Sequence, residues 1–251
     1  MMIFVNSPHH GSGVTVVAIN LAVALHKMGF QTALMDSDTI EPKVAEYLGL
    51  GKVSTACCFP EFARGKANFV KASSLSPISA MRVMPSRKVP GVKVTTEMVK
   101  SMVLRSASIL HYDFIVVDAS TQIVKIPDVL NPQHLVVLNP SDLFSEDTRV
   151  FFVKLSHLNK FYTRLVNRSS AATIHRLNAT LVKAPDLKID MMLPEDHIVF
   201  ESIAARESAY VMSPNSKFCL AIRKVADFYK ELEFGRKNEG TFKVLKELFN
   251  K

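Results

Sequence analysis

One segment near the start of the chain constrains the fold more than any other. An apolar run over residues 3–6 is followed by a turn with two glycines, Gly11 and Gly13, and then by a helical stretch from Thr15. A strand, a glycine turn and a helix in this order direct backbone N–H groups at the space before the helix, where an anion binds favourably. Phosphate-binding loops of this kind carry a lysine directly before their final Ser or Thr. Here that place holds Val14, so the sequence predicts the shape of such a loop without its charge.

The composition suits one large α/β domain, since the 251 residues are 48% hydrophobic and 22% charged. No apolar run reaches about 18 residues, so no segment is expected to span a membrane, and the start lacks the features of a signal peptide. The three cysteines fit a reducing compartment, and their spacing is not that of metal ligands. The net charge of +8 favours anionic lipid or nucleic acid as a partner, with a solvated basic surface as the alternative.

Strand-like and helix-like stretches alternate along the chain. This alternation predicts an α/β fold: a single doubly wound, mainly parallel sheet with helices on both faces. The expected strands are residues 3–6, 32–36, 80–84, 113–118, 135–138, 164–167 and 189–193. The expected helices are residues 15–28, 95–110, 147–158 and 216–232, the first of which ends at Gly29 as its C′ residue. We expect a domain over residues 1–232, a linker over 233–240 and a short C-terminal helix over 241–251.

Six short motifs follow one another along the chain. They are the glycine loop at 9–15, Asn20-Leu21-Ala22, Asp36-Ser37-Asp38, the strand from Tyr112 to Asp118, Leu165-Val166-Asn167-Arg168, and Leu193-Pro194-Glu195-Asp196 followed by Glu201-Ser202. In this order they resemble the ParA/MinD family of deviant-Walker P-loop ATPases over nearly the whole chain. The resemblance implies ATP and Mg²⁺ as cofactors.

The resemblance also implies a set of site residues. The nucleotide-binding residues would be Gly11, Ser12, Gly13, Val14, Thr15, Val16, Asn167, Arg168 and Pro194, with Asn167 at the adenine. Thr15, Asp36 and Asp118 would lie at the Mg²⁺, and Asp38 would orient the attacking water. Other roles stay open for these residues: Thr15 as a helix cap, Asn167 as a turn residue, and the aspartates as strand-end acids that face a helix dipole.

The chain departs from the family in the loop itself. In the register fixed by Asn20-Leu21-Ala22, the family's two lysines are replaced by His9 and Val14, and a glycine by His10. His9 would substitute for a lysine only when protonated. His10 is expected to change the path of the loop if position 10 requires a positive φ, which a side chain disfavours. A lysine contact to phosphate contributes about 1.5–3 kcal/mol to binding, and each missing donor slows hydrolysis by about 10²–10³. We therefore expect weak nucleotide binding and weak or absent hydrolysis.

Similar atypical loops occur in the TadZ/CpaE branch of the family, whose proteins act in pilus assembly and localisation. The stretch Met84-Pro85-Ser86, with Pro90 nearby, is also similar to that branch.

The C-terminal segment reads as a short amphipathic helix. Phe242, Leu245, Leu248 and Phe249 form its apolar side, and Lys243 and Lys246 lie opposite. This pattern is typical of an interfacial anchor and resembles the membrane-targeting tail of MinD-type members of the family. The alternative is a terminal helix that packs on its own core or on a partner. Two tails in a dimer would bind a membrane better than one.

These expectations describe a MinD/ParA-like spatial organiser or localisation protein with weak or absent hydrolysis. It would act as a homodimer in the cytoplasm, with peripheral contact at the inner face of the cell membrane. There it would recruit a partner machine for pilus assembly or cell division. Two alternatives stay open: a slow ATPase switch, and a DNA-associated partitioning protein.

Overall fold

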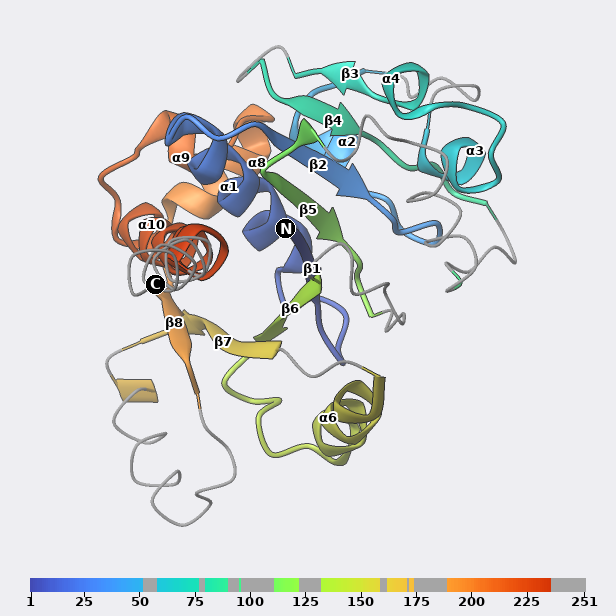
Figure 1. Ribbon diagram of the computed structural model, residues 1–251. Coiled ribbons are helices and arrows are strands. Elements are labelled where there is room, and N and C mark those ends of the chain that lie inside the picture. Colours follow the sequence, from blue (N-terminus) through green and yellow to red (C-terminus); the bar gives the residue numbers. More distant parts are fainter. Residues whose placement is uncertain are drawn as a thin grey trace, which may run out of the picture.

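The computed structural model describes residues 1–51, 58–76, 80–89, 95, 111–121, 132–158, 162–170, 172–173 and 189–235. Their strands form one eight-stranded sheet in the order β3-β4-β2-β5-β1-β6-β7-β8 (Figure 1). The strands are β1 (Met2–Asn6), β2 (Thr32–Asp36), β3 (Ser74–Leu75), β4 (Arg82–Met84), β5 (Phe114–Asp118), β6 (Pro132–Leu138), β7 (Tyr162–Ser169) and β8 (Met191–Pro194). Each neighbouring pair is parallel except β3 and β4, which are antiparallel.

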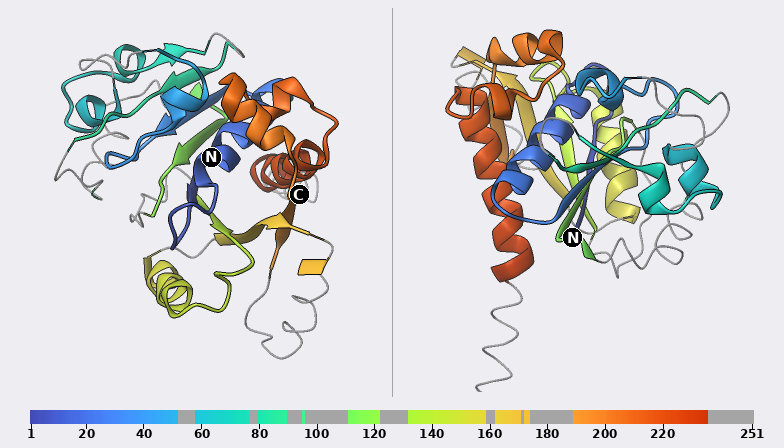
Figure 2. Two further views of the ribbon diagram at one scale, coloured as in Figure 1. Left: turned by 180° about the vertical axis from the view of Figure 1, so that it is seen from behind. Right: turned by 90° about the horizontal axis from the view of Figure 1, so that it is seen from above.

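Helices cover both faces of this sheet (Figure 2). The helices are α1 (Val14–Lys27), α2 (Val44–Tyr47), α3 (Phe59–Ala63), α4 (Phe69–Ala72), α6 (Glu146–Leu158), α8 (Ile198–Ala205), α9 (Ala209–Met212) and α10 (Lys217–Lys230). One face packs on α1, α2, α8, α9 and α10, and the other packs on α3, α4 and α6. The alternation along β1 shows why: Ile3 and Val5 point to the first face, Met2 and Phe4 to the second.

Helix α1 lies at the centre of the first face. It is apolar on nearly every side, with Val17, Ala18, Leu21, Ala22 and Leu25 fully buried, and a helix of this composition is stable only inside a core. It ends as predicted, since Gly29 has a φ of +94° and donates its N–H to His26 O. Its start is held at the carboxyl end of β1.

The predicted fold class is confirmed. Every expected strand is present within a few residues, and so are the helices expected over 15–28, 147–158 and 216–232. The helix expected over 95–110 lies outside the described residues, apart from residue 95. Strand β3 and the short helices α2, α3, α4 and α9 were not predicted. Helix α8 carries Glu201 and Ser202 of the last motif, where the resemblance implies a helix.

The packed body extends past residue 232, where the domain was expected to end. Glu231–Gly235 form a π-helical turn that continues α10. Within it, Phe234 stacks on Phe30, with ring centroids 5.2 Å apart, and meets the edge of Phe114 at 6.0 Å. The first residues of the predicted linker therefore belong to the core. Residues 236–251, with the rest of the linker and the C-terminal helix, lie outside the described residues. None of the helices described here has both the length and the apolar character needed to cross a bilayer.

Candidate functional site

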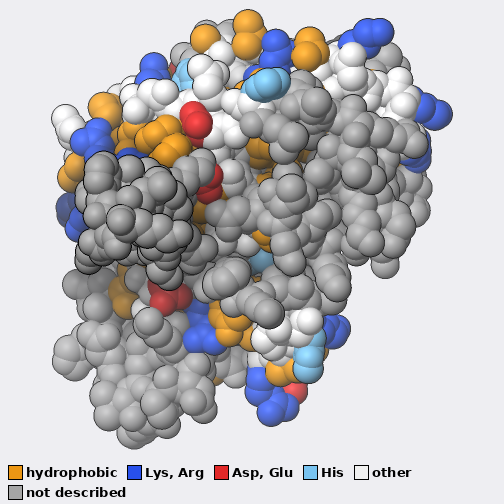
Figure 3. All heavy atoms as spheres, viewed as in Figure 1, with side chains coloured by type: hydrophobic (Ala, Val, Ile, Leu, Met, Phe, Trp, Pro, Cys, Tyr) orange, Lys and Arg blue, Asp and Glu red, His pale blue; other side chains and the backbone are white. Residues whose placement is uncertain are grey.

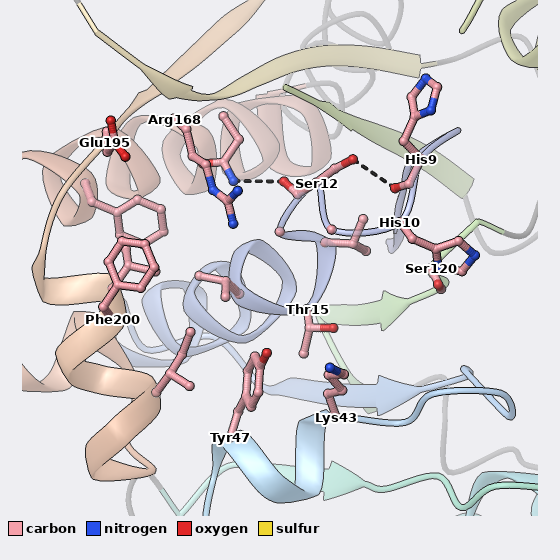
Figure 4. Close-up of a pocket in the computed structure, with 18 of the residues that line it drawn as sticks. His9, His10, Ser12, Thr15, Lys43, Tyr47, Ser120, Arg168, Glu195 and Phe200 are labelled. Carbon is pink, nitrogen blue, oxygen red and sulfur yellow. Dashed lines mark hydrogen bonds between the residues drawn. The ribbon is translucent and has the colours of Figure 1, made fainter. Parts of the chain in front are cut away.

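A pocket opens at the carboxyl ends of the central strands. The sheet order reverses beside β1, because the chain leaves β1 for β2 on one side and later returns to β6 on the other; ligands of open α/β sheets bind at such a point. The pocket brings together all nine residues predicted to bind nucleotide, and Asp38 with them. Its further lining residues are His9, His10, Glu41, Lys43, Tyr47, Ser120, Glu195, Asp196, Val199, Phe200, Ile203 and Phe218 (Figure 4).

The glycine loop turns into α1 through left-handed backbone. Gly11 and Gly13 have φ values of +76° and +89°, and Gly13 is the N-cap of α1 without any side-chain cap. Thr15 lies inside the first turn, so the helix-cap role left open for it is excluded. The N–H groups of a first helical turn have no partner within the helix, and here they face the pocket. His10 has no positive φ, so its side chain causes no left-handed backbone strain in the loop. A change in the path of the loop at His10 stays a prediction.

The loop is held by hydrogen bonds among its own residues. The Ser7 hydroxyl donates to Ser12 Oγ at 2.8 Å, the Ser12 hydroxyl donates to His9 O at 2.9 Å, and the His9 N–H donates to Ser7 Oγ at 3.1 Å. Ser12 is 1% exposed. The loop thus keeps a fixed shape through serine hydroxyls.

The His9 ring points away from the pocket (Figure 4). Its Nε2 lies 3.0 Å from both Ser145 Oγ and Thr148 Oγ1. The Ser145 hydroxyl donates to Thr148, and the Thr148 hydroxyl donates to Asp142 O. These contacts hold the His9 ring between the two hydroxyl groups. The expectation that a protonated His9 could replace the missing lysine is corrected, because the ring is bound at the start of α6.

Asn167 connects β7 to the same loop. Its Nδ2 donates to Ser12 O at 2.9 Å, and the side chain is 5% exposed. A Cβ at Gly13 would collide with this amide group. The structure thus gives Asn167 a contact with the loop that the sequence did not predict, while the predicted adenine contact stays a prediction. The neighbouring Arg168 has a φ of +53° and directs its side chain into the pocket (Figure 4).

Two predicted metal ligands, Asp36 and Asp118, are paired in register on β2 and β5. Both are buried, at 0% and 1% exposure. The Asp118 carboxylate accepts hydrogen bonds from the Thr15 hydroxyl and the Ser120 N–H. Burial raises the pKa of Asp118 to about 6. Burial, and then the charge of Asp118, raise the pKa of Asp36 well above its ordinary value.

Asp36 and Asp38 also shape the loop after β2. Asp36 accepts the N–H groups of Asp38, at 3.0 Å, and Val44, at 3.2 Å. Asp38 Oδ1 accepts those of Ile40, at 2.7 Å, and Glu41, at 2.9 Å. Asp36 therefore positions the start of α2, and its role at a metal stays a prediction.

The donor set fits the Mg²⁺ of a bound nucleotide. In the part of the chain that the structure describes, no cluster of three or more His, Cys, Asp or Glu could hold a metal ion. Mg²⁺ seldom uses an all-protein cage and is usually bound by one or two carboxylates together with phosphate oxygens. Thr15 lines the pocket, and its hydroxyl is hydrogen-bonded to the buried Asp118, so the two residues supply such a partial set. Asp118 and Asp36 themselves lie behind the residues that line the pocket. A cation there would also offset the cost of the two buried carboxylates.

Sequence reasoning missed several lining residues, Lys43 and Tyr47 among them. Lys43 lies five residues after Asp38. A search for cations in the loop after the Asp36-Ser37-Asp38 motif could have found it. The apolar end of the pocket is formed by Val199, Phe200 and Ile203 on α8 and Phe218 on α10. It had no such signal, because the motif order does not show which side of these helices faces the pocket.

The sequence matches no known family and no curated protein. Solved structures nevertheless share its fold. The MinC:MinD cell division protein complex of Aquifex aeolicus matches with a TM-score of 0.73 and 20% identity, over 91% of this chain and 95% of that one. MinD of Pyrococcus horikoshii OT3 complexed with Mg-ADP matches with a TM-score of 0.69 and 22% identity, over 92% and 97%. A ParA family ATPase of Chlorobium tepidum TLS matches with a TM-score of 0.68 and 19% identity, over 90% and 98%. The chain therefore has the fold of MinD and ParA proteins.

Proposed function

We propose that this protein binds an adenine nucleotide with Mg²⁺ in the loop pocket and hydrolyses it weakly or not at all. The observation that carries this proposal is the junction of the loop, α1 and β5. There the first helical turn faces the pocket and the Thr15 hydroxyl is bonded to the buried Asp118. Mg-ADP in a MinD structure of the same fold supports this choice of ligand.

Each residue would have one task. The N–H groups of residues 13–16 would bind phosphate, and Thr15 and Asp118 would hold the Mg²⁺. Arg168, Pro194 and the apolar wall on α8 would bind the nucleoside end. Asp38 would orient a water. Bound Mg²⁺ would supply charge to neutralise phosphate oxygens.

Weak hydrolysis follows from what the loop lacks. Phosphoryl transfer depends on cations held at the phosphate oxygens. Position 14 is a valine that is 9% exposed, and the His9 ring is bound to Ser145 and Thr148 instead.

The test is a titration of the purified full chain with a fluorescent ATP analogue, with and without Mg²⁺. We expect weak, Mg²⁺-dependent binding and turnover near background. Failure to bind ATP or ADP at millimolar concentration would refute the proposal. Turnover that Asp38→Ala abolishes would instead favour a slow ATPase switch, which the position of Asp38 in the pocket allows.

For the biological role, we propose a dimeric spatial organiser that recruits a partner machine, of pilus assembly or cell division, at the membrane. The MinC:MinD complex, a structure of the same fold with a partner, supports this role. The DNA-associated alternative has less support. On the face seen in Figure 3, the described Lys and Arg side chains are scattered around the rim and do not form one band. Light scattering in the same titration would measure the dimer.

A further inference from the structure

Two cations reach the glycine loop from outside it. Among the described residues that line the pocket, the Lys and Arg side chains are those of Lys43 and Arg168. Lys43 directly precedes α2, and Arg168 lies near the end of β7, so they approach from opposite walls (Figure 4). The loop itself has no lysine at position 9 or 14. Among the described residues, cationic side-chain contacts to an anion in this pocket therefore come from its walls.

Buried hydrogen bonds fix the backbone at Lys43. The N–H of the next residue, Val44, donates to the buried Asp36 Oδ2 at 3.2 Å, and Lys43 O accepts the N–H of Tyr47 at 2.9 Å. These two bonds fix the backbone at the rim of the pocket. The side chain is exposed, and its ammonium group points toward Thr15 (Figure 4).

This ammonium group is free to meet an anion. Lys43 has no ion pair within the described ranges. A lysine on its flexible stem is a mobile point charge, suited to a phosphate group whose position is set by other contacts.

We propose that Lys43 binds the terminal phosphates of a nucleoside di- or triphosphate, and so takes the place of the lysine that position 14 lacks. The proposal rests on the proposed nucleotide site and names a residue of that site. Thr15, at the phosphate end, is the residue that Lys43 faces, while Phe200 and Glu195 lie at the other end of the pocket (Figure 4). Lys43 should therefore discriminate by the number of phosphates.

The test compares Lys43→Ala with the wild-type chain by titration with fluorescent ATP, ADP and AMP analogues in Mg²⁺. Loss of a charged contact should weaken ATP and ADP binding about 10- to 100-fold and leave AMP binding almost unchanged. The salt dependence of ATP binding should also become shallower, because one cationic contact is gone. Lys43→Arg should keep most of the affinity.

Lys71→Ala is the matched control. Lys71 is an exposed lysine on α4, which covers the opposite face of the sheet. Lys71→Ala changes the net charge by the same amount as Lys43→Ala and should leave the affinities for ATP, ADP and AMP unchanged. Adding Val14→Lys to Lys43→Ala should recover ATP binding, because it returns a lysine to the phosphate site. If Lys43 had only a structural role, a lysine at position 14 would not restore binding.

The outcomes separate two failures. If the wild-type chain binds no nucleotide, the nucleotide site itself is refuted. If the wild-type chain binds ATP and Lys43→Ala binds it equally well, or loses ATP and AMP binding alike, the role of Lys43 is refuted and the nucleotide site stands.

Discussion

At the scale of single residues, the site holds two buried carboxylates without a cation among the described side chains to neutralise them. Desolvation makes the ionised forms of Asp36 and Asp118 costly. The charge of Asp118 adds to this cost at Asp36, and the charge of Asp38 adds to it at Asp118. Carboxylates with raised pKa values of this kind are common at sites where a protein binds a cation. The folded chain therefore gives up stability at neutral pH at the place where Mg²⁺ is proposed to bind.

This cost predicts the pH dependence of stability. The pKa of Asp118 rises from an ordinary value of 3.8 to about 6 in the folded chain. The folded state thus binds more protons than the unfolded state between these values. The free energy of unfolding should fall as the pH rises through this window, by up to about 3 kcal/mol from Asp118 alone. The raised pKa of Asp36 should add to this fall and extend it to higher pH. Thermal unfolding without ligand, measured from pH 4 to pH 8, checks this.

The variant Asp118→Asn removes the charge of this side chain and so measures its contribution to stability. An asparagine oxygen can still accept a hydrogen bond, so the variant should be more stable than wild type, by about three times as much at pH 7.5 as at pH 4.5. It should also lose the stabilisation that Mg²⁺ and ATP give the wild-type chain. The half-exposed Asp227 on α10 supplies the control, Asp227→Asn. Equal effects of the two variants at pH 7.5 would contradict the argument.

At the scale of elements, the glycine loop is held between α1 and β7 by one side chain. Asn167 donates to Ser12 O and fills the space where a side chain at Gly13 would lie. Gly11 has a similar positive φ but nothing within 4 Å of its missing Cβ. An alanine at Gly11 would therefore introduce backbone strain alone, whereas an alanine at Gly13 would also displace the Asn167 side chain.

We expect Gly11→Ala to cost about 1–2 kcal/mol of unfolding free energy, from left-handed backbone alone. Gly13→Ala should cost the same and, in addition, about 0.5–1.5 kcal/mol for the displaced Asn167 hydrogen bond. Urea unfolding measures both. Adding Asn167→Ala should cost less in the Gly13→Ala background than in wild type, because the contact is already lost. Strictly additive effects would show that Asn167 does not hold the loop.

The same elements show how far the sequence alone could lead. The strand from Phe114 to Asp118 and the helix from Val14 to Lys27 were predictable, since the first is a short β-branched apolar run and the second a longer apolar run that ends at Gly29. Motif order placed Asn167 and Thr15 at one pocket. It could not show that Asn167 bonds to Ser12, or that His9 bonds to Ser145, because these partners are set by tertiary packing. Phe234 was missed since polar residues surround it, although it packs against two aromatic rings.

At the scale of the whole molecule, the packed body and the C-terminal segment are proposed to act separately. The core holds the chain as far as Gly235, through Phe234 and the turn that continues α10. Residues beyond Gly240 are therefore not needed for the contacts described here. The proposed amphipathic helix over 241–251 would then be free to bind a surface.

A membrane role for this segment can be tested by removing it. Burial of a Leu or Phe contributes about 1.5–3 kcal/mol, although interfacial burial is partial and a short isolated helix is marginal in water. Lys243, Lys246 and Lys251 would each add up to about 1 kcal/mol near anionic lipid. One tail should therefore bind weakly and two tails in a dimer measurably.

Truncation after Gly240 should abolish co-sedimentation with anionic vesicles and leave the thermal unfolding of the body unchanged. Leu245→Glu should have nearly the same effect, because it places a charge in the middle of the apolar face. Leu220→Glu is the matched control: it makes the same change at an apolar side chain on α10 that is 44% exposed, and should not alter sedimentation. If the truncated chain sediments as well as the full chain, the tail is a packing helix. The basic surface of the body, with its share of the +8 net charge, would then be the better candidate for contact with lipid or DNA.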